Sequence, residues 1–166
     1  TKIASVASNI TLDNVEARNM LKVKIQGIPT EKLQLQGGRQ ALNGQVLTVK
    51  REVLTNLASE LQIENLAALE KIFLKPGPFI QSDNKKIRDQ VREILKDKPN
   101  APPLARARML LDWVHTHIKK RPVLSLPDAL STLENRVGDC NEHAVLLAAL
   151  ARSAGIPTRI EAGLVY

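Results

Sequence analysis

The residues best suited to chemistry surround the single cysteine of the chain, in residues 138–144 with the sequence GDCNEHA. A cysteine attacks as the thiolate, and an ordinary thiol with a pKa of about 8.5 is mostly protonated at neutral pH. The N-terminus of a helix favours negative charge through its unpaired N–H groups and its macrodipole. Asp139 is the predicted cap of such a helix, and Cys140 follows it directly. We therefore identify Cys140 as a candidate nucleophile.

The neighbours of Cys140 have supporting roles in this hypothesis. Gly138 predicts a tight turn that lets the backbone approach a substrate, and the N–H of Cys140 is a candidate oxyanion donor. For Glu142 three possibilities remain open: pairing with an arginine, capping of the turn, or a solvated carboxylate without a partner. His143 lies three residues after Cys140 and shares a helix face with it, so its imidazole is close enough to interact with the thiol. The supporting motif is Gly138, Asp139, Asn141, Glu142 and His143.

Two other interpretations of the cysteine remain open from spacing alone. Buried structural cysteines are common in cores rich in alanine and leucine. Cys140, His143 and Asp139 are also possible metal ligands, with His115 or His117 as a distant fourth. However, no Cys-x-x-Cys or His-Glu-x-x-His pattern supports a metal site. We predict no metal and no cofactor, and we expect His115 and His117 at the surface.

The composition indicates a globular protein with a basic surface. Of 166 residues, 43% are hydrophobic and 25% are charged, whereas only 2% are aromatic. Aliphatic side chains must therefore form the core, and a site that stacks nucleic-acid bases is disfavoured. The net charge of +7 is typical of a solvated surface or of attraction to an acidic polymer. We expect no nucleic-acid partner and, without an apolar run of about 20 residues, no membrane insertion.

The patterns divide the chain into a β-rich accessory module over 1–56 and a mainly helical part over 57–166. In the first, residues 21–28 and 45–51 alternate in polarity, and Asn43-Gly44 predicts a hairpin. We expect three or four antiparallel strands there. The helical period then starts near Leu54. The predicted elements are helices over 54–72, from a cap at Ser82 or Asp83 to Lys96, over 104–118, over 128–134 opened by Pro127, and over 140–153, then a strand over 158–165.

A longer stretch around the cysteine resembles a known family. Residues 126–166, LPDALSTLENRVGDCNEHAVLLAALARSAGIPTRIEAGLVY, resemble the start of the transglutaminase-like core of bacterial proteins. The pieces that match, in order, are Asp128-Ala129-Leu130, Thr132-Leu133, Gly138 to Ala144, Leu146-Leu147, Leu150-Ala151-Arg152 and Gly155 to Arg159. Upstream, Trp113-Val114 resembles the helix that precedes this motif. The resemblance covers about residues 85–166. It places His143 within the motif and not at the position of the base, so we expect His143 to pack or hydrogen-bond rather than act as the base.

The resemblance implies a papain-like α+β fold, in which a small antiparallel β module precedes the helical half of the cysteine-enzyme core. It implies a Cys-His-Asp triad whose cysteine forms a thioester from a peptide or carboxamide bond, with hydrolysis or transamidation to follow. Protein or peptide substrates are expected, and bacterial relatives are more often proteases or amidases than cross-linkers. The resemblance also suggests a location in the bacterial envelope.

The sequence departs from the family pattern at its C-terminal end. In the family the histidine and aspartate follow on strands after the cysteine helix, whereas this chain reaches Tyr166 on the first strand. We interpret the chain as an N-terminal part that lacks normal turnover. The helix over 144–151 is apolar nearly all round, so we expect an uncovered surface and a homodimer or swapped assembly. The alternatives are a non-catalytic scaffold for protein interaction and a basic surface that binds an acidic polymer.

Overall fold

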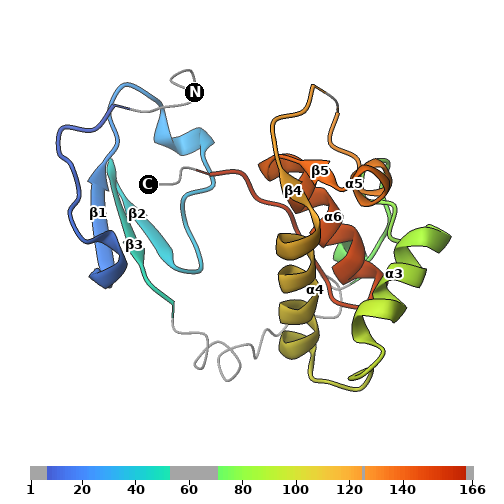
Figure 1. Cartoon of the computed structure of the whole chain (residues 1–166). Coiled ribbons are helices and arrows are strands. Elements are labelled where there is room, and N and C mark those ends of the chain that lie inside the picture. The colour runs from blue at the N-terminus through green and yellow to red at the C-terminus, as the bar shows by residue number, and fades with distance from the viewer. Residues whose placement is uncertain (1–6, 53–70, 125, 164–166) are drawn as a thin grey trace. The chain divides into compact units, whose positions relative to one another are not determined.

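The computed structural model describes residues 7–52, 71–124 and 126–163. The chain divides into two compact units, residues 1–63 and 64–166 (Figure 1). The boundary predicted at 56/57 lies outside the described residues. Most of the predicted helix over 54–72 also lies outside the described residues, which resume at residue 71. Residues 71–73 are helical.

The first unit contains a three-stranded antiparallel sheet with strand order β1-β3-β2. Its strands are β1 (Met20–Lys24), β2 (Gln40–Asn43) and β3 (Val46–Lys50), with short 3-10 helices η2 (Val15–Ala17) and η3 (Thr30–Lys32) between or before them. The predicted hairpin is present, because Asn43 pairs with Val46 across a two-residue loop in which Gly44 has a φ of 57°. Among residues 7–52, only Thr30 is buried.

The second unit is built around the cysteine helix. Its elements are α3 (Lys85–Leu95), α4 (Pro103–His117), β4 (Lys119–Lys120), α5 (Ala129–Asn135), β5 (Val137–Gly138) and α6 (Cys140–Ser153). Helix α6 packs against α3, α4 and α5 (Figure 1). The largest fully buried side chains of this core are Ile87, Leu110, Leu146 and Leu150. The fold is α+β, as predicted.

The helix ends depart from the prediction in two places. Helix α3 is capped by Asn84, whose side chain accepts a hydrogen bond from the Lys86 N–H at 2.9 Å, not by Ser82 or Asp83. Helix α5 is capped by Asp128, so Pro127 precedes the helix instead of lying in its first turn. Ser82, Asp83 and Asn84 are three consecutive polar residues before α3. Spacing alone does not decide which of them adopts the extended backbone of a cap.

The strand predicted over 158–165 is not formed in residues 158–163. Instead, Thr158 donates its backbone N–H to the Phe73 carbonyl at 3.1 Å. The Arg152 guanidinium donates to the Thr158 carbonyl at 2.8 Å and to the Lys75 carbonyl at 2.6 Å. Alternating polarity predicts a strand only where a partner strand is available. Here side-chain and turn contacts hold the segment against the end of α6.

The apolar surface expected on α6 is also mostly covered. Of the eight residues from Ala144 to Ala151, six are buried, while Ala144 and Leu147 are half-buried. The core of α3, α4 and α5 thus encloses a helix that was expected to stay open. The most exposed large apolar side chains of this unit lie elsewhere, at Leu124 and Leu126 in the loop before α5.

Candidate active site

Cys140 is the first residue of α6 and is exposed. Strand β5 leads into it, and Asp139 forms the N-cap between them with an extended backbone. The Cys140 sulfur lies 3.9 Å from the Asn141 side-chain oxygen. The N–H of a first-turn residue has no acceptor within its own helix, and among the described residues the Cys140 N–H has no hydrogen-bond partner. An exposed sulfur and a free amide donor are thus next to each other, as attack on a carbonyl requires.

A capping box fixes this helix end. Glu142 is 6% exposed, and its Oε2 accepts a hydrogen bond from the Asp139 backbone N–H at 2.8 Å. Of the three possibilities for Glu142, capping is therefore the one observed, and the solvated carboxylate is wrong. Such a reciprocal cap satisfies backbone donors that the helix leaves unpaired. The carboxylate of Glu142 therefore holds the residue that precedes Cys140.

Gly138 is required by close packing against Glu142. A Cβ added at Gly138 would lie 2.3 Å from the Glu142 Cβ and 2.9 Å from its Cγ. Non-bonded carbons pack at about 3.5–4.0 Å, so no larger residue fits without displacing β5 or α6. The sequence assigned this glycine to a tight turn that admits substrate. The structure places the first turn of α6 directly over it.

His143 contacts backbone carbonyls and not another catalytic side chain. Its Nδ1 lies 2.7 Å from the Asp139 carbonyl and its Nε2 lies 3.3 Å from the Ile118 carbonyl. Because both ring nitrogens face carbonyl oxygens, the ring bridges the first turn of α6 and the residue before β4. These contacts suit the hydrogen-bonding role expected for His143.

Strand β4 lies alongside β5 and brings basic residues near Cys140. The two strands are parallel, with Lys119 opposite Val137 and Lys120 opposite Gly138. The next residue, Arg121, donates its backbone N–H to the Gly138 carbonyl at 2.9 Å. The side chains of Lys119, Lys120 and Arg121 are exposed. The sequence analysis counted these three as a local basic group but did not place them beside Cys140.

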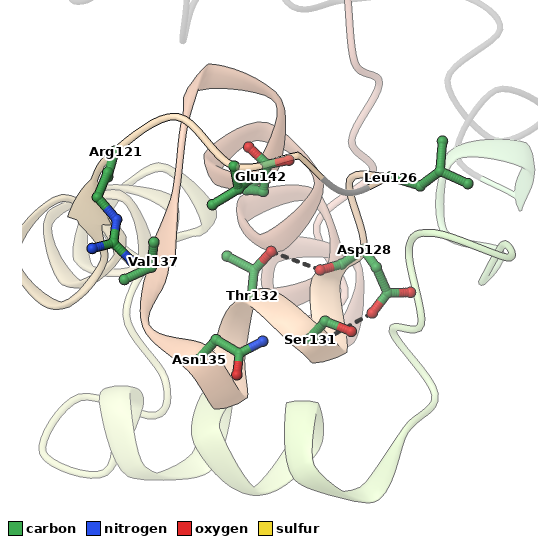
Figure 2. Close-up of a pocket in the computed structure, with 9 residues that line it drawn as sticks. Arg121, Leu126, Asp128, Ser131, Thr132, Asn135, Val137 and Glu142 are labelled. Atoms are coloured by element: carbon green, nitrogen blue, oxygen red, sulfur yellow. Dashed lines mark hydrogen bonds between the residues drawn. The ribbon is translucent and has the colours of Figure 1, made fainter.

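A cavity of about 360 Å³ lies beside Glu142 (Figure 2). Residues of α5, β5 and the first turn of α6 line it, together with residues of the segments 121–124 and 126–128. They are Arg121, Val123, Leu126, Asp128, Ser131, Thr132, Asn135, Val137 and Glu142. Cys140 is not among these residues. Burial raises the pKa of Asp128, but hydrogen bonds from Ser131, Gln81 and Leu130 outweigh it, so the pKa lies below its usual value. The Asp128 carboxylate is thus engaged in capping α5.

Trp113 and Arg136 form a packed cluster that sequence reasoning missed. The Arg136 guanidinium lies 4.6 Å above the Trp113 ring, and the ring stacks on His117 at 4.7 Å. Arg136 has a φ of 56°, which is rare outside glycine, and burial lowers the pKa of its guanidinium. It also donates to the Gln90 side chain at 3.1 Å. His115 and His117 are exposed, as expected, and lie on α4.

Neither a metal-binding group nor a membrane-spanning helix is found in the part of the chain that the structure describes. No group of three His, Cys, Asp or Glu side chains there is arranged to hold a metal ion. In the same residues, no helix combines the length and the apolar character needed to cross a membrane.

Comparison with known proteins shows what the segment around Cys140 is similar to. Residues 88–166 match the family model of the transglutaminase-like superfamily. The match includes α3 to α6 except for the first turn of α3, and it contains the whole Gly138–His143 motif. None of the curated proteins compared with the chain matches it.

A solved structure supports the same fold. It is that of a protein from Cytophaga hutchinsonii, named a "putative cysteine protease", which superposes with a TM-score of 0.51 at 21% sequence identity. The alignment covers 68% of this chain and 39% of that protein. The aligned part of this chain therefore shares its fold with part of that longer protein, of which this chain spans less than half.

Proposed function

We propose that this chain carries the nucleophile of a transglutaminase-like cysteine hydrolase or acyltransferase that acts on peptide or carboxamide bonds. The observation that carries the proposal is the exposed Cys140 at the first position of α6, inside the segment that matches the transglutaminase-like superfamily. The Asp139–Glu142 cap and the Gly138 contact fix this position.

The reaction proceeds through a thioester. The Cys140 thiolate attacks the carbonyl carbon, the C–N bond breaks, and the amine departs with a proton. Water then adds to the thioester and releases an acid, or a second amine adds and forms a new amide; both steps return the free thiol. The unpaired N–H of Cys140 supplies one hydrogen bond to the oxygen that becomes negative.

The proton transfers require a base that we do not assign to a histidine of these 166 residues. His115 and His117 lie on α4, and both nitrogens of His143 face backbone carbonyls. In the proposed mechanism a histidine and an aspartate outside these residues complete the triad. The 166-residue chain should therefore form an acyl-enzyme with a reactive ester but not turn over.

Acylation by p-nitrophenyl acetate tests this proposal. We expect a burst of one nitrophenolate per chain, a matching acetyl group on Cys140 by intact mass and peptide mapping, and very slow release afterwards. Cys140→Ala is the matched control, because the residue is exposed and the chain has no other cysteine. If wild type and Cys140→Ala acquire the same acetyl groups, the sulfur is not the nucleophile.

A further inference from the structure

We infer that the substrate segment that binds next to Cys140 is acidic, and that Lys119, Lys120 and Arg121 recognise it. This inference rests on the proposed function, because it names the substrate class of the same site. It starts from three consecutive cationic residues that are exposed on and just after β4. Among the residues that the structure describes, none of the three side chains has an ion-pair or hydrogen-bond partner.

The pairing of β4 with β5 sets the distance between these charges and the sulfur. Lys120 lies opposite Gly138, and Arg121 is hydrogen-bonded to Gly138, which is two residues before Cys140. Neighbouring strands are about 4.8 Å apart and consecutive Cα atoms 3.8 Å apart. The Cα atoms of Lys120 and Arg121 are therefore within about 10 Å of that of Cys140. Lysine and arginine side chains are long and flexible, so from this distance they can extend toward a substrate bound at the sulfur.

The acidic groups nearby do not cancel these charges. Glu142 is 6% exposed, and its carboxylate holds the Asp139 amide. Asp139 itself is half-buried at the cap of α6. The carboxylate of Glu134 is already paired with Lys86. Consequently the charge that faces solvent along β4 is basic, and the helix N-terminus adds to it.

An acidic peptide fits this surface better than a nucleic acid does. Nucleic-acid binding neutralises many phosphates along a long basic surface, whereas this strand offers three cations beside one reactive sulfur. Single-stranded binding also uses aromatic side chains for base stacking, and only 2% of the chain is aromatic. A peptide with two or three acidic residues next to its reactive carbonyl matches both the charge and the short length.

The test uses N-iodoacetyl peptides that alkylate Cys140 in the 166-residue chain, so that it does not depend on turnover. The probes are N-iodoacetyl-Glu-Glu-amide and its neutral counterpart N-iodoacetyl-Gln-Gln-amide. Free iodoacetamide measures the reactivity of the thiol alone. The quantity measured is the ratio of the two peptide alkylation rates, Glu-Glu over Gln-Gln.

Wild type is compared with Lys119→Gln/Lys120→Gln. A matched control is Lys96→Gln/Lys98→Gln, which makes the same change in net charge near the start of α4. The start of α4 lies near the C-terminal end of α6, because Arg106 of α4 donates to the Ala154 carbonyl. That end of α6 is about 20 Å from Cys140 along the helix axis. Arg121→Gln tests the third cation separately.

Coulomb's law gives the expected size of the effect. Two lysines at about 10 Å from two carboxylates make four pairs, each worth about 1.6-fold in rate when the Debye length is about 30 Å at 0.01 M salt. We expect Lys119→Gln/Lys120→Gln to lower the ratio about seven-fold at that salt and about two-fold at 0.15 M. The rate with iodoacetamide and the behaviour of the control variant should change little.

Each contrary outcome has a distinct meaning. If the ratio is the same in wild type and Lys119→Gln/Lys120→Gln, the acidic-substrate inference is wrong while the nucleophile proposal stands. If Lys96→Gln/Lys98→Gln lowers the ratio equally, only net charge matters and the inference is again wrong. If iodoacetamide does not alkylate folded wild type, Cys140 is inaccessible, and both the proposed function and this inference fail.

Discussion

Substitution of Gly138 by alanine should destabilise the helical unit strongly, although it adds only one methyl group. The new Cβ would lie 2.3 Å from the Glu142 Cβ. The position of a Cβ is set by its own backbone, so Glu142 cannot escape by changing rotamer. Either β5 or the first turn of α6 must move, and the hydrogen bond between Glu142 and the Asp139 amide at 2.8 Å is then weakened or lost.

The cost can be estimated from two contributions. Overpacking of this kind costs about 1–3 kcal/mol, and loss of a capping interaction costs about 1 kcal/mol more. The free energy of unfolding should therefore fall by about 2–4 kcal/mol. With a urea m-value of about 1–3 kcal/mol per molar, the unfolding midpoint of Gly138→Ala should fall by about 1–2 M.

Tryptophan fluorescence during urea unfolding reports on the helical unit, in which Gly138 lies. Trp113 is the only tryptophan of the chain, and it stacks on His117 within the helical unit. Gly77→Ala is the matched control, because a Cβ there meets nothing within 4 Å and the φ of Gly77 is not in the left-handed region. We expect its midpoint to stay the same or rise slightly, since alanine reduces the freedom of the unfolded chain.

Double variants identify which atoms clash. Glu142→Gly removes both Cβ and Cγ, so adding Gly138→Ala to it should cost little. Glu142→Ala keeps the Cβ that makes the closest contact, so the alanine at 138 should still destabilise that background. Equal midpoints for Gly138→Ala and Gly77→Ala would refute the steric reasoning. Rescue by Glu142→Ala as complete as that by Glu142→Gly would show that the contact with Cβ is not the cause.

Two further predictions concern the supports of the site. Asp128→Ala should cost about 1 kcal/mol at neutral pH, because the N-cap is lost. Hydrogen bonds lower the pKa of Asp128 in the folded state, so its stabilisation is present above the unfolded pKa of about 3.9 and is lost as pH falls through the folded pKa. The urea midpoints of wild type and Asp128→Ala should therefore converge in strong acid. A difference that stays constant with pH would contradict this assignment. Arg136→Gly should be more stable than Arg136→Ala by about 1 kcal/mol, because only the alanine keeps a Cβ in the left-handed region at a φ of 56°. Both variants lose the guanidinium over Trp113, so that loss cancels in the comparison. Equal thermal midpoints of the two variants would exclude backbone strain at this position.

Local signals in the sequence predicted the elements that depend on local interactions. The apolar period over 104–118 corresponds to α4 at Pro103–His117, and the start of α6 at Cys140 is the residue predicted. Both helices carry their own hydrogen bonds and an apolar face, which are properties of a short stretch of sequence. The Asn43-Gly44 hairpin was predictable for the same reason.

Features that depend on distant partners were not predictable. The segment from Thr158 alternates in polarity, but its backbone bonds to Phe73, far away in the chain, instead of joining a sheet. The covering of α6 depends on side chains from three other helices, such as Ile87 and Leu110. A helix that is apolar all round predicts burial, but it does not specify which elements provide it.

The motif around Cys140 shows the same division within one site. The start of the helix at Cys140 and its cap at Asp139 followed from the local sequence. The reason for Gly138 did not, because a glycine before a helix is equally consistent with a tight turn, a close substrate and a packed side chain. Only the 2.3 Å approach of Glu142 distinguishes these possibilities. The position of Lys120 beside Gly138 likewise requires the pairing of two short strands that no local pattern indicated.

The contacts that position Cys140 and the charges proposed to select its substrate lie on different strands, so they should be separable by mutation. Gly138 and Glu142 belong to β5 and α6 and are packed against each other. Their variants should lower stability and alkylation by every reagent together, because the helix end itself moves. Lys119 and Lys120 are exposed on β4, where substitutions usually change stability by less than about 0.5 kcal/mol. Their variants should change the preference between acidic and neutral peptides and leave the reaction with iodoacetamide intact.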